Sequence, residues 1–357
     1  MKKVMIATGG TGGHIYPATA LAEILKKVYP DCEITFFGSS NRMEARMIPE
    51  LGYRFTGLEM TGMNGGISDK LKSFLSLVKA ERYCRKLLKE EKPDICVGFG
   101  NYISVPLIMA AHRLHIPTMI HEQNSYAGKA NALLGRYADA IVGCYETSLK
   151  QFPEKKTRLY GNPEATLACE KETNRTILER YGLKQAPFVV MMMGSLGSSS
   201  VSKVIDEACA LFDDYQVVIA AGKANDYVYQ NAGRENIHVL DYVDGVQMLK
   251  QCDCAVVRAG ATTMCEITAI GTPAILIPSP YVPNNHQVMN ALELVNKNAA
   301  VMIEEKDLSA QKLAGTLNEL MADSEKRAKL SEHAKSLGKR DAAYRMIEWM
   351  EELSVHE

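Results

Sequence analysis

Short apolar runs alternate with longer stretches of helical period in the first part of the chain. The runs are rich in β-branched residues, as buried strands are. They predict strands at residues 3–8, 33–37, 95–98, 117–121 and 140–143. Between them, helical patterns predict helices at residues 17–29 and 69–91. Strands that alternate with helices in this order indicate a parallel sheet with crossover helices.

The second half of the chain repeats this order of elements. Apolar runs predict strands at residues 188–193, 216–220, 255–258 and 274–277. Helices are predicted at residues 201–212, 263–270 and 341–353. The polar stretch at residues 160–164 has the turn residues of a linker. We therefore predict an α/β protein with two doubly wound domains, at residues 1–162 and 163–340.

The clearest motif is the run GGTGGH at residues 9–14, directly after the first predicted strand. Glycines let backbone N–H groups approach an anion, and a helix start adds partial positive charge, so the run predicts a phosphate site. The alternative is a merely tight turn. The run departs from the dinucleotide fingerprint GxGxxG, the acid expected after the second strand is missing, and no GxxxxGK[ST] occurs. NAD enzymes and P-loop NTPases are therefore disfavoured.

Two similar turns follow other predicted strands, GFGNY at residues 98–102 and GSLGSS at 194–199. Ordinary strand-to-helix turns would explain either one, yet the three together point to diphosphates on both sides of a cleft between the domains. Polar runs also follow strands: HEQNS at residues 121–125, RAGATTMCE at 258–266 and PNNHQVMNA at 283–291. Their side chains suit the hydroxyl groups of sugars, and the alternatives are Asx turns and helix caps.

Charge and composition exclude several classes of protein. The 41 basic and 42 acidic residues give a formal net charge of −1, which argues against a surface built to hold nucleic acid. Nine scattered cysteines without a CxxC indicate neither a disulfide framework nor a zinc site, and a reducing cytoplasm fits best. His112 and His115 have no evident third ligand, so we expect no metal site. We also expect neither an export signal nor a membrane-spanning helix.

Residues 70–89 are unusually basic. They include seven basic residues and one acid, with Leu71, Phe74, Leu75 and Val78 at helical spacing. Such an amphipathic segment can lie on an anionic membrane. The alternative is a helix that docks its apolar stripe on the domain core and leaves its lysines in water.

Taken together, the motifs resemble those of the MurG family. The matching runs are GGTGGHIYP from residue 9, GNY from 100, HEQN from 121, GNP from 161, GSLG from 194 and GATTMCE from 260. The resemblance implies a GT-B glycosyltransferase, with two Rossmann-like domains facing a cleft, at the cytoplasmic face of the bacterial plasma membrane. It also implies inverting transfer of N-acetylglucosamine from UDP-N-acetylglucosamine (UDP-GlcNAc) to the 4-hydroxyl of the muramoyl sugar of lipid I. The product would be lipid II, for the peptidoglycan of the cell wall.

The resemblance also implies roles for individual residues. Donor contacts are expected at Thr11, Gly12, Gly13, Asn124, Ser195, Val243, Ala261, Thr262, Thr263, Met264, Cys265, Glu266 and Gln287. Within that set, Glu266 would take the ribose hydroxyls and Val243 would border the uracil. Acceptor contacts are expected at Gly10, Gly100, Tyr102 and Glu122. The membrane-facing residues would be Lys72, Phe74, Leu75, Val78, Lys79 and Arg82, and the C-terminal helix at 341–357 would cross back to the N-terminal domain.

His14 is the candidate general base, because an imidazole titrates near neutral pH and this one follows a strand that ends at the predicted cleft. No DxD pair stands in a metal-binding setting, so helix N-termini near Ser195 and Thr262 would stabilise the departing UDP without a cofactor. Leu196 and Ala165 depart from the family pattern, which puts donor contacts from these two positions in doubt. Two alternatives stay open, a UDP-GlcNAc 2-epimerase of similar build and a non-catalytic two-domain binding protein.

Overall fold

The computed structural model describes residues 1–60, 67–194, 199–222, 226–231, 233–282 and 285–355. The chain divides into two compact units, the first made of residues 1–167 and 341–357 and the second of residues 168–340. The predicted boundary stood at residue 162. The chain leaves the first unit only at residue 167, within helix α7 (Pro163–Glu170). The C-terminal helix belongs to the first unit.

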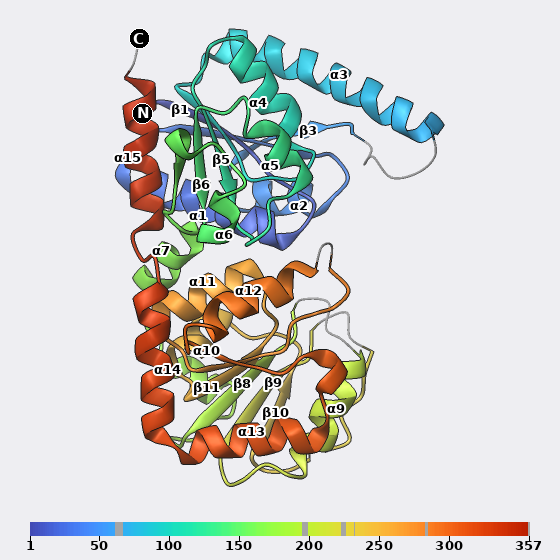
Figure 1. Ribbon diagram of the computed structural model, residues 1–357, viewed down its shortest axis with the longest axis vertical. Helices are drawn as coiled ribbons and strands as arrows, with labels where there is room; N and C mark the ends of the chain where they lie inside the picture. Colours follow the sequence, from blue (N-terminus) through green and yellow to red (C-terminus); the bar gives the residue numbers. More distant parts are fainter. Residues whose placement is uncertain (61–66, 195–198, 223–225, 232, 283–284, 356–357) are drawn as a thin grey trace. The chain divides into compact units, whose positions relative to one another are not determined.

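A seven-stranded parallel sheet forms the centre of the first unit, in the order β3-β2-β1-β4-β5-β6-β7 (Figure 1). Its strands are β1 (Lys3–Ala7), β2 (Glu33–Ser39), β3 (Arg54–Leu58), β4 (Ile95–Gly98), β5 (Thr118–Glu122), β6 (Ala140–Gly143) and β7 (Thr157–Arg158). Ala7 at the end of β1 is in register with Phe37 of β2 and Gly98 of β4. The strand order reverses between β1 and β4, which is the topological switch point where open α/β sheets bind ligands.

Helices cover both faces of this sheet. They are α1 (Gly12–Val28), α2 (Met43–Glu50), α3 (Ile67–Glu91), α4 (Ser104–Arg113), α5 (Lys129–Leu134), α6 (Glu146–Leu149), the 3-10 helix η1 (Glu154–Lys156) and α15 (Ala342–Ser354). Apolar residues of α1 and α15 share one core with the sheet, and those of α3 and α4 share another. The C-terminal helix buries Met346, Ile347 and Met350 in the first of these cores.

Helix α1 begins at Gly12, whereas the sequence pattern predicts a start at Pro17. The N–H groups of His14 and Ile15 both donate to the Thr11 carbonyl, at 3.1 and 3.2 Å, so the first turn closes well before the proline. Proline is a good first-turn residue, and for that reason it suggested the wrong start. His14 is therefore a residue of the first helical turn.

The second unit repeats the plan with a six-stranded parallel sheet, ordered β10-β9-β8-β11-β12-β13. Its strands are β8 (Phe188–Met192), β9 (Gln216–Ala220), β10 (Ile237–Leu240), β11 (Cys254–Val257), β12 (Ala274–Leu276) and β13 (Val301–Met302). Its helices are α8 (Thr176–Arg180), α9 (Ser199–Cys209), α10 (Gly245–Gln251), α11 (Ala261–Ile270), α12 (His286–Val295), α13 (Ala310–Ala322), α14 (Ser324–Leu337) and the 3-10 helix η3 (Glu305–Asp307). The order of this sheet reverses between β8 and β11. The prediction of two doubly wound units is confirmed.

Candidate functional site

The glycine-rich loop leaves β1 at the switch point of the first unit and runs into α1. Thr11 is the N-cap of α1 and is exposed, and Gly12 and Gly13 form the first turn. The N–H groups of Gly12 and Gly13 precede the first backbone hydrogen bond of α1, and no hydrogen bond from the Thr11 side chain caps them. This geometry suits the phosphate site that the sequence predicts.

Side chains from the first turns of α2 and α1 lie close to the predicted acceptor positions. The Gly10 N–H donates to Oε2 of Glu44 at 3.2 Å. Gly100 is buried, and a Cβ built on it would come within 3.2 Å of Nδ1 of His14. Tyr102 is half-buried and directly precedes Ile103, the N-cap of α4. The acceptor contacts of Gly10, Gly100 and Tyr102 stay predictions, whereas Glu44 had no role in the sequence analysis.

His14 is held by a backbone carbonyl of the adjacent loop. Its Nδ1 lies 2.8 Å from the carbonyl oxygen of Phe99. A carbonyl can only accept, so Nδ1 carries the ring hydrogen and the lone pair of the neutral ring is on Nε2. The Gln123 amide also contacts Nδ1, and its Oε1 is buried without a partner among the described residues. Turning that amide over would let its oxygen accept from His14 as well.

His121 and Glu122 do not project from the sheet edge as the sequence suggested. Both belong to β5, which is buried along its whole length. His121 donates from Nε2 to the Gly161 carbonyl at 3.0 Å, and burial lowers the pKa of His121 to about 4. The imidazole is therefore neutral at pH 7 and serves the fold. A central parallel strand is covered on both faces, so polar residues at its end can face inward.

The Glu122 carboxylate organises the loop that follows β5. It accepts hydrogen bonds from the Gly128 N–H at 3.0 Å, the Asn131 side chain at 2.9 Å and the Asn124 N–H at 3.1 Å. Burial raises the pKa of Glu122, while these donors stabilise its charge. Asn124 itself is half-buried. The roles predicted for Glu122 and Asn124 in substrate binding stay predictions.

In the second unit, the start of α11 has the features of an anion site. Gly260 is the N-cap and has no side chain to cap the first turn, which consists of Ala261, Thr262 and Thr263. The buried Oγ1 of Thr262 has no hydrogen-bond partner among the described residues. Such a hydroxyl, beside first-turn N–H groups that have no acceptor within the helix, is suited to a ligand oxygen. Glu266 lies in the next turn and is half-buried.

Of the other predicted donor residues, two have side chains in the core and two make hydrogen bonds within the second unit. The side chains of Val243 and Met264 are part of the core, so only their backbone atoms could touch a nucleotide. Cys265 donates from Sγ to the Thr262 carbonyl at 2.9 Å, and Gln287 accepts from the Ser279 N–H at 2.8 Å. Ser195 lies outside the residues that the structure describes.

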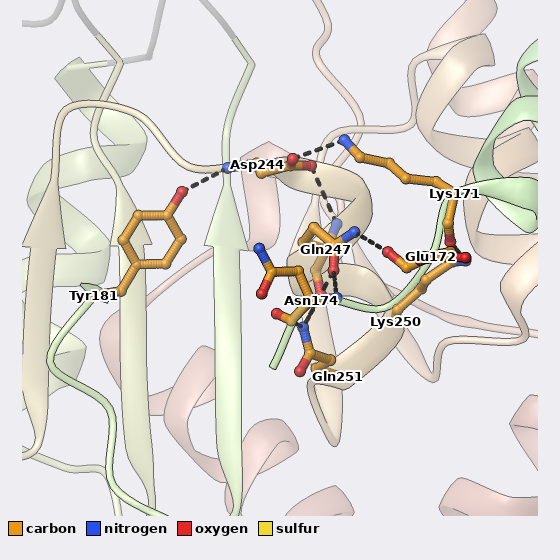
Figure 2. A network of polar contacts seen from close by, with 8 residues as sticks. All are labelled: Lys171, Glu172, Asn174, Tyr181, Asp244, Gln247, Lys250 and Gln251. Carbon is orange, nitrogen blue, oxygen red and sulfur yellow. Dashed lines mark hydrogen bonds and ion pairs between the residues drawn. The ribbon is translucent and has the colours of Figure 1, made fainter. Parts of the chain in front are cut away.

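Figure 2 shows the polar network that holds the segment before α10. Asp244 is the N-cap of α10, accepts from the Gln247 N–H at 3.2 Å and pairs with Lys171 at 2.7 Å. Its own N–H donates to the Tyr181 hydroxyl at 3.0 Å. The network therefore fixes the backbone at Val243, the residue expected to border the uracil.

An ion pair between a buried arginine and a half-buried glutamate lies at the same edge of the second sheet. Arg258, directly after β11, contacts Glu305 at 2.6 Å, and its guanidinium also donates to the Ile277 carbonyl at 3.1 Å. Glu305 lines a cavity of about 360 Å³ together with residues of α9 and of the segment between β12 and α12, such as Val201 and Tyr281. Sequence reasoning missed the pair, because its partners are 47 residues apart.

Helix α3 carries the predicted membrane-facing residues. Leu71, Phe74 and Leu75 are exposed to 60%, 57% and 59%, values that are high for large apolar side chains. Exposed cations accompany them at Lys72, Lys79 and Arg82, and Val78 is half-buried. The last turns instead bury Cys84 and Leu88 in the core that α3 shares with α4. The core-docking alternative thus describes α3 from Leu77 onward, whereas Leu71, Phe74 and Leu75 stay exposed.

Two absences hold for the described ranges alone. No helix in them is long and apolar enough to cross a membrane. No three His, Cys, Asp or Glu side chains in them gather as metal ligands. Activity without metal stays a prediction.

Both halves of the chain match family models. Residues 4–142 match the glycosyltransferase family 28 N-terminal domain, and residues 188–346 match the glycosyltransferase family 28 C-terminal domain. A protein of Limosilactobacillus fermentum is 38% identical over 97% of this chain and 96% of its own length. A protein of Latilactobacillus sakei is 39% identical over 97% of this chain and 99% of its own length. Both are named UDP-N-acetylglucosamine–N-acetylmuramyl-(pentapeptide) pyrophosphoryl-undecaprenol N-acetylglucosamine transferase.

Solved structures agree on the fold. The crystal structure of MurG from Acinetobacter baumannii has a TM-score of 0.79 at 24% identity and covers 99% of this chain and 100% of its own. A putative UDP-N-acetylglucosamine 2-epimerase from Listeria monocytogenes has a TM-score of 0.74 at 16% identity. The match covers 100% of this chain and 98% of the epimerase chain. These similarities confirm the GT-B architecture. With both family models and curated relatives matched along nearly the whole sequence, the chain belongs to glycosyltransferase family 28 and, within it, to the MurG family.

Proposed function

We propose that this protein transfers N-acetylglucosamine from UDP-GlcNAc to the 4-hydroxyl of the muramoyl sugar of lipid I, which forms lipid II. The observation that carries the proposal is the identity of 38–39% over 97% of the chain to relatives named for this transferase. The anchored His14 at the first switch point and the α11 start at the second sheet edge supply chemistry that the reaction needs.

In this proposal His14 is the general base. As the acceptor oxygen attacks the anomeric carbon, its proton moves to Nε2 of His14, and the bond to UDP breaks with its electrons passing to the diphosphate. Attack from the face opposite the leaving group inverts the configuration from α to β. The bond from Nδ1 to the Phe99 carbonyl supports this role, because it keeps the lone pair on Nε2. A base of this kind contributes about 10²- to 10⁴-fold in rate.

The start of α11 would hold the donor. Its first-turn N–H groups and the Thr262 hydroxyl would donate to phosphate oxygens, where charge grows as UDP departs. Glu266 would accept hydrogen bonds from the ribose hydroxyls. We propose no metal for this step.

The N-terminal half of α3 would rest on the anionic cytoplasmic face of the plasma membrane, where a polyprenyl acceptor is found. Exposed Leu71, Phe74 and Leu75 would enter the interface, and the cations at Lys72 and Lys79 would meet anionic headgroups. Each cation near the surface contributes about 1 kcal/mol.

Vesicle sedimentation tests this surface. A variant with Lys72, Lys79 and Arg82 changed to Glu should bind vesicles containing anionic lipid at least about 10²-fold more weakly, since it loses three attractive charges. The matched control changes three exposed lysines of the second unit to Glu: Lys312, Lys329 and Lys335. Equal loss in both variants would show a general charge effect and contradict a role for α3.

The transfer reaction is tested with radiolabelled UDP-GlcNAc and a short-chain lipid I analogue in excess EDTA. A β-linked disaccharide product is expected, and it would establish both the transfer and its independence of divalent metal. Product that forms only when Mg²⁺ is restored would overturn the metal-free step alone. Loss of UDP-GlcNAc without any acceptor would favour the epimerase or a hydrolase and overturn the proposal.

A further inference from the structure

The peptide bond between Gly9 and Gly10 is held from both sides by two side chains. The Asn101 side-chain amide donates to the Gly9 carbonyl at 3.1 Å, and the Gly10 N–H donates to Oε2 of Glu44 at 3.2 Å. The C=O and N–H of one peptide unit lie in one plane and point in opposite directions. Two partners on opposite sides therefore fix the orientation of that plane, and we call this arrangement the Gly9–Gly10 clamp.

Glu44 is built into the clamp and is not a surface acid. It is fully buried in the first turn of α2, where the helix dipole favours a negative charge. While Oε2 accepts from Gly10, Oε1 accepts from the Ser39 N–H at 2.9 Å, at the end of β2. Each carboxylate oxygen thus has its own backbone donor, and the side chain ties the loop after β1 to the end of β2.

Asn101 holds the other side from the loop after β4. It has a φ of +59°, a left-handed conformation in which asparagine is common, and its Oδ1 accepts from the Tyr102 N–H at 2.6 Å. The side-chain amide is thereby oriented toward Gly9. The clamp also accounts for both glycines: a Cβ on Gly9 would collide with the Glu44 carboxylate, and one on Gly10 would collide with the Asn101 amide.

The clamped peptide lies two residues before the start of α1, and His14 lies in the first turn of that helix. Glycine pairs adopt many backbone conformations, so an unclamped Gly9–Gly10 peptide would rotate readily. Rotation would move Thr11, the N-cap, and with it the first-turn N–H groups. We infer that Glu44 and Asn101 are positioning residues for glycosyl transfer, which hold the glycine-rich loop and the start of α1 in their active arrangement. This inference rests on the proposed function.

Two variants release one side of the clamp each. Glu44→Gln keeps the shape of the side chain but offers one acceptor oxygen instead of two, so an amide NH2 faces one of the two N–H donors. Asn101→Gly removes the donor to Gly9 while glycine tolerates the left-handed φ. The matched controls are Glu81→Gln, which changes another buried carboxylate of the first unit, and Asn298→Gly, which changes another left-handed asparagine.

The measurement is kcat with the short-chain lipid I analogue, divided by the fraction of molecules whose first unit is folded. That fraction is measured from the fluorescence of Trp349, which packs in the first unit. A variant that only reduces the amount of folded protein therefore keeps the kcat of wild type. Each clamp variant should lose about tenfold to a hundredfold in kcat, whereas the controls stay within twofold of wild type. The UDP dissociation constant, measured by calorimetry, should change less than twofold.

The double variant supplies the sharper result. Because Glu44 and Asn101 hold the same peptide, their combined loss should be well below the product of the two single losses. Losses that multiply, or clamp variants as active as their controls, would overturn this inference and leave the proposed function intact. A wild-type protein without transfer activity would overturn the proposed function, and this role with it.

Discussion

Acidification should destabilise the first unit through His121. In the folded chain, burial lowers the pKa of His121 to about 4, whereas an unfolded histidine titrates near 6.5. Below pH 6.5 the histidine therefore binds a proton in the unfolded chain but stays neutral in the folded chain, so lowering the pH favours unfolding. The effect begins near pH 6.5 and levels off once the pH falls below about 4.

The size of the effect follows from the gap between the two pKa values. Each pH unit of the gap is worth about 1.4 kcal/mol, so the full loss of unfolding free energy is about 3 kcal/mol, of which about 2 kcal/mol is lost between pH 7 and pH 5. His121→Gln removes the titration, and the glutamine amide can still donate to the Gly161 carbonyl that Nε2 contacts at 3.0 Å. The variant should therefore lose about 2 kcal/mol less than wild type over that range.

Urea unfolding at pH 7 and pH 5 measures this difference. Trp349 is the only tryptophan of the chain and packs against Tyr160 in the first unit, with 5.7 Å between ring centroids, so its fluorescence follows that unit alone. His112→Gln, at an exposed histidine of the same unit, is the matched control and should behave as wild type. If wild type and His121→Gln lose the same stability between the two pH values, the imidazole is not the neutral structural group described above.

Three further predictions concern the site. His14→Ala should lower turnover by about 10²- to 10⁴-fold in the transfer assay while UDP binding in calorimetry is unchanged, and unchanged turnover would exclude His14 as the base. Thr262→Val should weaken UDP binding about tenfold or more without lowering thermal stability, because the buried hydroxyl has no protein partner among the described residues. An unchanged affinity for UDP would place this hydroxyl away from the donor. Arg258→Met should destabilise the second unit by about 3 kcal/mol in scanning calorimetry, since the Glu305 side chain, only 12% exposed, would lose its cation. The double variant Arg258→Met, Glu305→Gln should lose less stability, and an equal loss would contradict this reason.

Local patterns predicted the parts of the fold that depend on local physics. Buried strands such as β1 and β8 are continuous apolar runs, and the bounds of the predicted strands differ from the observed ones by at most two residues. Strand β3 was missed because its sequence RFTGL mixes polar and half-buried positions at a sheet edge. The start of α1 was missed because backbone hydrogen bonds to Thr11 close the turn before Pro17.

The sequence predicted which loops form the candidate site better than it predicted the contacts between individual side chains. The motifs named the loops at both switch points, since loop position follows from strand order. Glu44 could not be found this way, because its contact with Gly10 spans 34 residues and depends on the pairing of β1 with β2. The inward direction of His121 likewise follows from the helices that cover β5 on both faces, which no local run of residues encodes.

The placement of α15 has a consequence for how the protein is made. The first unit shares its core with Met346, Ile347 and Met350, and the Ala343 N–H donates to the Thr166 hydroxyl at 3.0 Å. Its sheet leaves the ribosome first, yet its core is complete only when the last helix has been synthesised. During translation of residues 168–340 an apolar groove therefore stays open on the nascent first unit. A chain that stops after residue 340 would retain that groove, and we expect it to require a chaperone or to aggregate.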